Sequence, residues 1–333
     1  MPEISARKRI RKKDLTRTRA RLLSWFDSQG RALPWRETRD PYRTMVAEVM
    51  LQQTQTGRVA PLYQDFLARF PTLDALAHAP AMDVIQAWHG LGYNRRAVEL
   101  QRAAQRVAGE HGGVFPSNPA ALRRMPGLGE YSANAIACFA FDAQVPVVDT
   151  NVRRVLARAA LGRDAGDVPG DRLGALAAEW LPEGEAYRWN QALMDVGAML
   201  CRVAKPLCPK CPLRVTCVYH AKGRHRQAPA RTRRASEPFE GSRRQARGTI
   251  VDHLRRAARK GITVGELHRQ MHPEGDGDPA VLVAILTKLE SEGLAELSPA
   301  ARAGSARGLV RLPLRSKPPV GAMADERRGR KRR

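Results

Sequence analysis

Residues 125–154 read MPGLGEYSANAIACFAFDAQVPVVDTNVRR. The segment Met125 to Gly129 sets two glycines between apolar stretches of helical spacing, so we expect a tight hairpin between two helices. Backbone N–H groups of such a hairpin point outward at a helix N-terminus and can hold a phosphate. A PGxG segment alone is more often an ordinary turn, so its meaning depends on its surroundings.

Twenty residues beyond the hairpin, an apolar extended segment leads into Asp149, Thr150 and Asn151. We expect a helix to begin near Val152, which places Asp149 at its N-terminus. The simplest interpretation is helix capping, which all three residue types favour. A second acid elsewhere in the chain makes a catalytic role for Asp149 more credible.

That second acid is Glu48, which interrupts the apolar run of residues 45–51. The run follows Asp40 and Pro41, a capping residue and a proline at the first helical position, so we expect a helix there. A carboxylate on such a helix is costly unless it is exposed or useful. The amide-rich residues 52–55 follow and could hydrogen-bond to base edges or fill a gap in a base stack.

Four of the five cysteines, Cys201, Cys208, Cys211 and Cys217, lie within seventeen residues, separated by six, two and five residues. Four thiolates in one short loop can hold a tetrahedral zinc or a [4Fe-4S] cluster. Zinc sites usually use two paired C-x2-C knuckles, and only one such pair is present, so the spacing favours iron and sulfur. Disulfides are the alternative, but with one leftover thiol, Cys138, and no recognisable secretory signal peptide, we expect an intracellular chain whose cysteines are reduced.

Fifty-seven Lys and Arg against thirty-three Asp and Glu give a net charge of +24. Arginine dominates, and its guanidinium pairs well with phosphate, which makes nucleic acid the expected partner. Basic runs at residues 7–13 and 327–333 account for only part of this charge. No run of about eighteen apolar residues occurs, so we expect no membrane association.

The pattern predicts a mainly α-helical protein with two folded parts. Residues 15–221 show successive short helices, whereas residues 222–243 have the composition of a linker. Helices are expected at 245–258, 264–271 and 279–292, followed by strands near 294–297 and 309–312, which together suggest a winged-helix-like domain over 244–315. Residues 1–14 and 316–333 are expected to be basic, disordered tails.

Together, the hairpin, Asp149 and the C-x6-C-x2-C-x5-C spacing resemble the helix-hairpin-helix DNA glycosylases related to endonuclease III. Pro34-Trp35-Arg36, the segment from Glu48 to Gln55 and Gly90-Leu91-Gly92-Tyr93 further resemble the A/G-specific adenine glycosylases of the MutY type. The resemblance covers roughly residues 15–220. It implies a two-lobed helical fold with a [4Fe-4S] cluster held by the four cysteines.

The resemblance also implies the activity, which is removal of adenine opposite 8-oxoguanine or guanine in double-stranded DNA. Glu48 would protonate the base at N7, and Asp149 would remain an anion beside C1′. The hairpin glycines and the basic cysteine loop would hold the DNA backbone. The other expected contacts are Gln53 and Tyr93 in the base stack, Trp35, Arg36, Tyr131 and Gln191 around the flipped adenine, and Asn151, Gly127 and Gly129 on the DNA.

Tyr131 departs from the bifunctional members of the superfamily, which carry a lysine two residues past the second hairpin glycine. A phenol cannot form a Schiff base, so we expect a monofunctional enzyme that leaves the strand intact. Two alternatives remain: a thymine or uracil glycosylase acting on mismatches with guanine, and a noncatalytic iron–sulfur DNA-binding protein.

The C-terminal part is where the resemblance fails. MutY proteins typically carry a β-rich module related to nucleotide pyrophosphohydrolases that reads 8-oxoguanine, and residues 244–315 do not resemble it. These residues could bind DNA, bind a protein, or only pack on the catalytic part. We expect a monomeric, cytoplasmic and nucleoid-associated bacterial protein.

Overall fold

The computed structural model describes residues 12–224, 239–275 and 277–315, and it is mainly helical, which confirms the predicted fold class. The expected tail at residues 316–333 lies outside the described residues, as does most of the expected linker. At the N-terminus, residues 12–14 belong to a helix, because α1 already begins at Lys12. None of the described helices is long and apolar enough to cross a membrane.

The chain forms two compact units that do not follow the predicted domain boundaries. Unit 1 comprises residues 1–44, 117–123 and 128–234, and unit 2 comprises residues 45–116, 124–127 and 235–333. Within the described residues, unit 1 contains α1 (Lys12–Gln29), η1 (Pro34–Arg36), α7 (Pro119–Leu122), α8 (Glu130–Phe141), α9 (Thr150–Leu156), the π-helix η2 (Ala157–Leu161), η3 (Ala165–Asp167), α10 (Gly170–Trp180), α11 (Ala186–Asp195), the π-helix η4 (Val196–Leu200), η5 (Cys208–Lys210) and α12 (Val218–Ala221).

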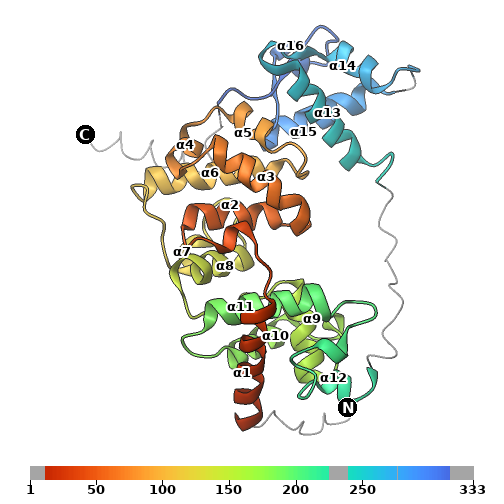
Figure 1. The fold of residues 1–333 in the computed structure, drawn as a ribbon. Coiled ribbons are helices and arrows are strands. Elements are labelled where there is room, and N and C mark those ends of the chain that lie inside the picture. Colours follow the sequence, from red (N-terminus) through yellow and green to blue (C-terminus); the bar gives the residue numbers. More distant parts are fainter. Residues whose placement is uncertain (1–11, 225–238, 276, 316–333) are drawn as a thin grey trace. The chain divides into compact units, whose positions relative to one another are not determined.

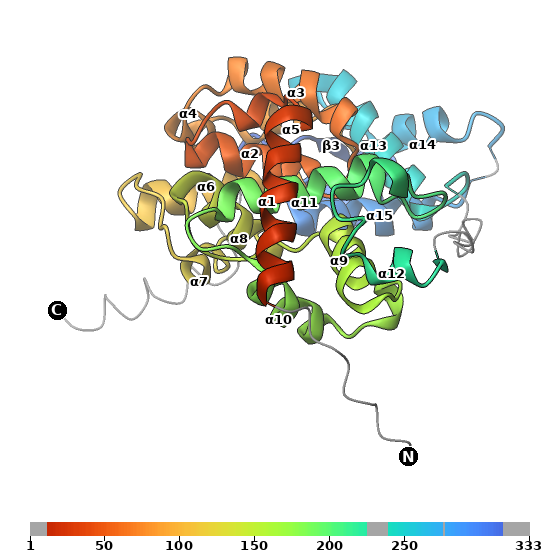
Figure 2. The ribbon, with the colours of Figure 1, turned by 60° about the horizontal axis from the view of Figure 1, so that its bottom comes forward.

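The core of unit 1 lies between α1 and the helices α8 to α11. Trp180, Trp189 and Leu22 are almost completely buried there. Helix α1 packs against α11, and both views show the two helices side by side (Figures 1 and 2). This packing joins the N-terminal segment to the helix that carries Gln191.

Unit 2 joins the middle of the glycosylase-like region to the C-terminal residues. Its described elements are most of α2 (Pro41–Leu51), then α3 (Thr56–Arg69), α4 (Leu73–His78), α5 (Ala81–Ala87), α6 (Arg95–Glu110), α13 (Arg243–Ala257), η7 (Ala258–Lys260), β1 (Ile262–Thr263), α14 (Val264–Met271), α15 (Pro279–Glu292), β2 (Glu296–Leu297), α16 (Pro299–Arg302) and β3 (Leu309–Arg311). Asp40 caps α2 as predicted, since its Oδ1 accepts from the backbone N–H of Arg43 at 2.9 Å.

The C-terminal elements have the helix and strand order of a winged helix. Three antiparallel strands pair in the order β1-β3-β2, with Ile262 opposite Val310 and Leu297 also opposite Val310. Helices occupy all three predicted positions, and β1 and α16 are additional to the prediction. One continuous hydrophobic core joins this domain to α5 and α6, with Ile85 and Val98 packed among its apolar residues.

Candidate active site

Asp149 lies at the N-terminus of α9, as the sequence predicts. Its Oδ1 accepts a hydrogen bond from the backbone N–H of Val152 at 2.7 Å, and its Oδ2 accepts from Asn151 Nδ2 at 2.9 Å. Burial raises the pKa of Asp149, while these hydrogen bonds and the charge of Arg154 act in the opposite direction. The carboxylate is therefore largely removed from water but keeps donors that favour its anionic form.

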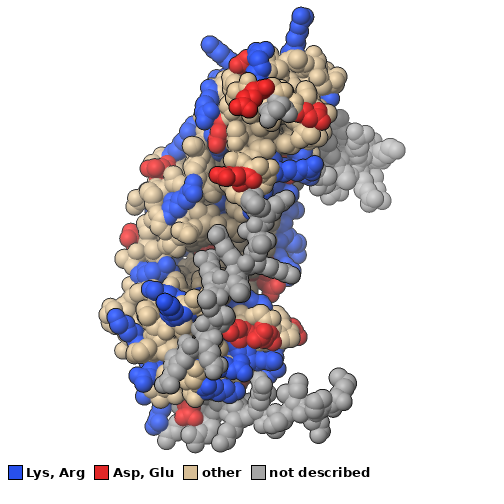
Figure 3. Space-filling model, turned by 90° about the vertical axis from the view of Figure 1, so that its right-hand side faces the viewer, with Lys and Arg blue, Asp and Glu red and all other residues tan. Residues whose placement is uncertain are grey.

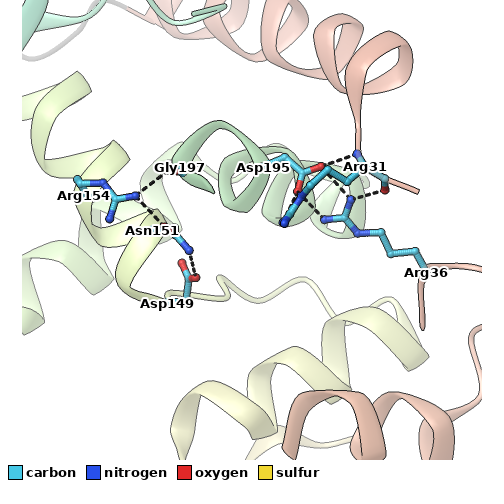
Figure 4. Close-up of polar contacts among 7 residues, drawn as sticks. All are labelled: Arg31, Arg36, Asp149, Asn151, Arg154, Asp195 and Gly197. Carbon is cyan, nitrogen blue, oxygen red and sulfur yellow. Dashed lines mark hydrogen bonds and ion pairs between the residues drawn. The ribbon is translucent and has the colours of Figure 1, made fainter. Parts of the chain in front are cut away.

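Arg154 connects the surroundings of Asp149, which Figure 4 shows, to the cysteine loop. Its Nη2 donates to Asn151 Oδ1 and to Gly197 O, each at 2.7 Å, and its Nε donates to Cys201 O at 2.6 Å. Gly197 is needed for this close approach, because a Cβ there would lie 2.5 Å from the Cβ of Asn151. One arginine thus fixes the amide that donates to Asp149 and the first residue of the cysteine loop.

Asp195 at the end of α11 is fully buried and is bound by two arginines (Figure 4). Arg36 Nη1 and Nη2 donate to its two oxygens at 2.8 and 2.9 Å, and Arg31 donates through its backbone N–H and its side chain. Burial would raise the pKa of Asp195, but the hydrogen bonds from Arg36 and Arg31 outweigh it and lower the pKa. These contacts hold the segment carrying Trp35 against the helix that carries Gln191.

The predicted hairpin is present between α7 and α8. Gly127 has φ 71°, and an added Cβ would lie 2.8 Å from the Cβ of Glu99, so glycine is required there on two grounds. Gly129 is the N-cap of α8, and Tyr131 lies in the first turn of that helix. The backbone N–H groups at this N-terminus are available in the geometry that suits a phosphate.

In unit 2, Glu48 is 4% exposed on α2, so the structure confirms that it is a buried acid rather than part of a solvated face. Gln53 and Tyr93 both have left-handed backbone conformations, with φ 57° and 46°. Tyr93 is 52% exposed, so its ring is not part of the hydrophobic core. Both side chains lie in exposed loops, where a DNA wedge is expected.

A single guanidinium, that of Arg96, holds these two loops. Nη1 donates to Val49 O, Met50 O and Gln52 O at 2.9, 2.9 and 2.6 Å, and Nη2 donates to Thr54 Oγ1, Leu91 O and Gly92 O at 3.1, 3.0 and 3.1 Å. Burial lowers the pKa of Arg96 to about 10, against a smaller opposing effect of Tyr93. Two of the six acceptors lie at the end of α2, and the other four lie in the loops that carry Gln53 and Tyr93, here called the wedge loops, so Arg96 fixes one loop relative to the other.

The four clustered cysteines form no disulfide and are partly buried, and Cys201, Cys211 and Cys217 pack beside the core of unit 1. Burial raises the pKa of Cys211 to about 12 and that of Cys217 to about 11. The charge of each of the other three cysteines also affects the pKa of Cys211, so the four lie close enough to interact. As placed in the described part of the chain, however, no three His, Cys, Asp or Glu side chains are arranged to bind a metal ion.

Arg158 anchors this loop from the π-helix η2 and is 2% exposed. It donates to Arg202 O at 2.6 Å and Val203 O at 3.0 Å, and Nη1 lies 3.8 Å from Cys201 Sγ. Asp164 accepts from its Nε at 2.8 Å. A thiolate at Cys201 would therefore face a buried positive charge, which suits a donor set that binds metal as thiolates.

The sequence predictions missed Arg96, Arg154, Arg158 and Asp195.

The Nη groups of Arg36 both bind Asp195, whereas its Nε–H is buried without a hydrogen-bond partner among the described residues. Trp35 is 9% and Gln191 5% exposed, so each is buried within unit 1. Their contacts with adenine stay predictions.

Lys and Arg side chains occur over the described surface and are not confined to the terminal segments (Figure 3). Exposed examples in the described residues are Arg43, Arg58, Arg95, Arg123, Arg202 and Arg214. The basic composition is therefore a property of the folded units as well as of the tails.

Comparisons with known proteins show which family the chain is similar to. Residues 46–169 match the family described as "HhH-GPD superfamily base excision DNA repair protein". The chain is 44% identical over 251 residues to the adenine DNA glycosylase of Mycobacterium tuberculosis, covering 74% of this chain and 81% of that protein. It is 39% identical over 279 residues to that of Mycolicibacterium smegmatis, covering 83% and 91%. Among solved structures, a thermostable thymine-DNA glycosylase aligns with TM-score 0.59 and 30% identity, covering 63% of this chain and 98% of that one.

Proposed function

Because the chain belongs to the adenine DNA glycosylases, a family of base-excision-repair enzymes that remove adenine from DNA, we propose that its substrate is adenine opposite 8-oxoguanine or guanine. We propose further that it acts as a monomer and leaves the DNA strand intact. The observation that carries the proposal is Asp149 at the N-terminus of α9, with Asn151 and Val152 donating to its carboxylate.

Breaking the N-glycosidic bond develops positive charge on the sugar and negative charge on the departing base. Asp149 supplies a fixed anion for the sugar, and the dipole of α9 together with two donors favours its ionised form. Glu48 serves as the acid for adenine N7, a role that its burial on α2 supports because removal from water favours a protonated carboxyl. Gln53 and Tyr93 fill the space that the flipped adenosine leaves.

Monofunctional chemistry follows from Tyr131. It is the second residue past Gly129 and lies on the first turn of α8, and its phenol has no amine to attack C1′. Strand breaks should therefore appear only after alkali treatment of the abasic product. Strand cleavage at neutral pH that borohydride traps as a covalent adduct would contradict this.

A [4Fe-4S] cluster held by Cys201, Cys208, Cys211 and Cys217 is part of the proposal. Four free thiols, their mutual electrostatic effects and the Arg158 contact with Cys201 support it. When bound, the cluster would order this loop as a structural centre and take no part in excision. Iron and sulfide analysis of the purified protein, with Cys211→Ser as the comparison, tests it.

Single-turnover excision with labelled duplexes tests the activity. The duplexes carry adenine opposite 8-oxoguanine or guanine, and thymine or uracil opposite guanine, each with and without alkali. Adenine release is expected, and Asp149→Asn should abolish it while leaving mismatch binding largely intact. Equal loss of binding and excision in this variant would assign Asp149 a folding role.

One solved structure favours a second candidate, because the thermostable thymine-DNA glycosylase is 30% identical over the aligned residues. Thymine or uracil removal opposite guanine is therefore the alternative. The buried acid Glu48 argues for adenine, since protonation assists departure of a purine. Thymine or uracil release without adenine release in the same assay would establish the alternative.

A further inference from the structure

The C-terminal domain is fixed to the helices that precede the Tyr93 loop and follow it. Arg255 on α13 donates to Ile85 O at 3.2 and 3.0 Å and to Asn94 Oδ1 at 2.9 Å. Ile85 and Val98 also enter the hydrophobic core of this domain. Asn94 directly follows Tyr93, so α13 is held next to a wedge loop within unit 2.

Between the wedge loops and α13, unit 2 contains a hollow of about 1050 Å³. Gln53 and Tyr93 line one side, and Phe239, Arg244 and Gly248 line the other. The hollow thus begins at the residues that the proposed function places in the base stack. DNA engaged by the wedge would have α13 beside it.

The charge of the lining suits a polyanion. Five arginines and two glutamates line the hollow. Arg95 pairs with Glu99, and Arg247 pairs with Glu292, so both acids already have a basic partner. Arg58, Arg96 and Arg244 give the excess positive charge, and Arg58 and Arg244 are exposed.

Two aromatic rings in the lining are also accessible. Tyr93 is 52% and Phe239 62% exposed, although rings of this size are normally buried. Exposed aromatic rings beside arginines are the combination that binds unstacked nucleotides, because the rings stack on bases and the cations hold phosphates.

The helix that usually enters DNA in a winged helix is poorly suited to this role here. The exposed residues of α15 are Pro279, Ala280, Val281, Ala284, Thr287, Lys288 and Ser291, with a single positive charge. By contrast, α13 carries Arg243, Arg244, Arg247, Arg255 and Arg256. Three of these arginines, Arg243, Arg244 and Arg256, are exposed, so the first helix of the domain presents more positive charge than α15 does.

We propose that this hollow receives the DNA strand opposite the excised adenine, with Arg244 against a phosphate and Phe239 against an exposed base. The inference rests on the proposed function, since that function places Gln53 and Tyr93 at the base pair being opened. It assigns the C-terminal domain a DNA-binding role carried by the helix that borders the wedge.

Arg244→Ala in the full chain tests the phosphate contact, with Arg243→Ala as the matched control. Both residues are exposed on the first turn of α13, but only Arg244 is among the residues lining the hollow. Affinity is measured for a duplex whose adenine nucleotide carries a 2′-fluorine, which resists excision. Arg244→Ala should weaken binding about tenfold and reduce the slope of log K against log salt by about 1. Equal effects of the two variants would overturn the proposal.

The strand is identified with duplexes in which one phosphate at a time is replaced by a neutral methylphosphonate. When the phosphate that Arg244 contacts is neutralised, the wild-type protein should lose affinity, whereas Arg244→Ala should lose no further affinity. This phosphate should belong to the strand opposite the adenine. The assignment would be refuted if this pattern occurred only at a phosphate of the adenine strand, or at no phosphate. Phe239→Ala should weaken binding about tenfold with an unchanged salt slope, because stacking releases no counterions.

Wild-type excision measured in parallel separates the two possible failures. If no duplex releases adenine, the proposed function is wrong. If adenine is released but Arg244→Ala behaves like Arg243→Ala, the proposed function stands and the opposite-strand site is wrong.

Discussion

Replacement of Arg96 by lysine is expected to loosen the two wedge loops without removing a charge. The guanidinium of Arg96 reaches six oxygen acceptors at 2.6–3.1 Å, four of them in these loops and two at the end of α2. An ammonium places its three donors on one atom and cannot reach acceptors on both sides. Several loop carbonyls would therefore lose their partner in the variant.

The two Nη groups of Arg96 carry four N–H donors, and a net gain of about 1 kcal/mol for each hydrogen bond sets a ceiling of about 4 kcal/mol. The burial that lowers the pKa of Arg96 to about 10 offsets part of this gain, and lysine retains some of the contacts. We therefore expect Arg96→Lys to reduce the free energy of unfolding by about 2 kcal/mol. The left-handed backbones of Gln53 and Tyr93 each cost roughly 1 kcal/mol, so loosened loops should leave these conformations.

The assay pairs chemical denaturation with single-turnover excision at saturating enzyme. A loss of about 1.4 kcal/mol of transition-state positioning lowers the rate about tenfold, which is the expected size of the effect. Arg95→Lys is the control, because Arg95 is exposed and its side chain pairs with Glu99. If the Arg96→Lys and Arg95→Lys enzymes have the same free energy of unfolding and the same excision rate, Arg96 does not hold the two loops in place.

Three further predictions concern other parts of the molecule. Asn151→Ala removes a donor that favours the anion of Asp149, so the pKa of Asp149 should rise further and the acid limb of the single-turnover pH profile should move to higher pH; an unmoved limb would exclude this role. Gly248→Ala should stabilise the protein by about 1 kcal/mol, because an added Cβ meets nothing within 4 Å on α13. Gly261→Ala should instead destabilise it, because φ is 71° and the Cβ would lie 2.7 Å from Val310 O; thermal melts compare the two. Arg158→Leu should reduce the iron retained by the purified protein during incubation with a chelator, and retention equal to wild type would show that Arg158 does not hold the cysteine loop.

The elements that the sequence predicts well are those whose signals are local. Helix α15 has the predicted bounds because Asp278 caps its start, Pro279 occupies the first position and Gly293 ends it in a left-handed conformation. The hairpin and the start of α9 follow from glycine and capping chemistry in the same way. The Asp149 cap is compatible with the proposed catalytic role of Asp149, so capping chemistry located the residue without distinguishing the two interpretations.

Residues whose role depends on distant partners could not be found in this way. Arg154 bonds to Cys201, and four of the six acceptors of Arg96 lie more than forty residues earlier, so the residues beside either arginine do not predict these contacts. The abundance of arginine makes such side chains still harder to recognise, because most of them suggest only a basic surface. Asp195 is the last residue of a helix of ordinary composition, and its importance is visible only once Arg31 and Arg36 are placed against it.

The C-terminal domain shows why a fold prediction and a functional prediction have to be argued separately. The periodicity of residues 245–292 predicts its helices, and a winged helix suggests DNA binding through its third helix. The exposed surface of α15 carries a single positive charge, whereas α13 exposes three arginines, of which Arg244 lines the hollow together with Tyr93. Because DNA binding requires positive charge where the phosphates lie, the location of the arginines decides which helix meets DNA. If α13 binds the strand opposite the adenine, a domain without the β-rich pattern expected of this enzyme type still has a surface from which to contact that strand.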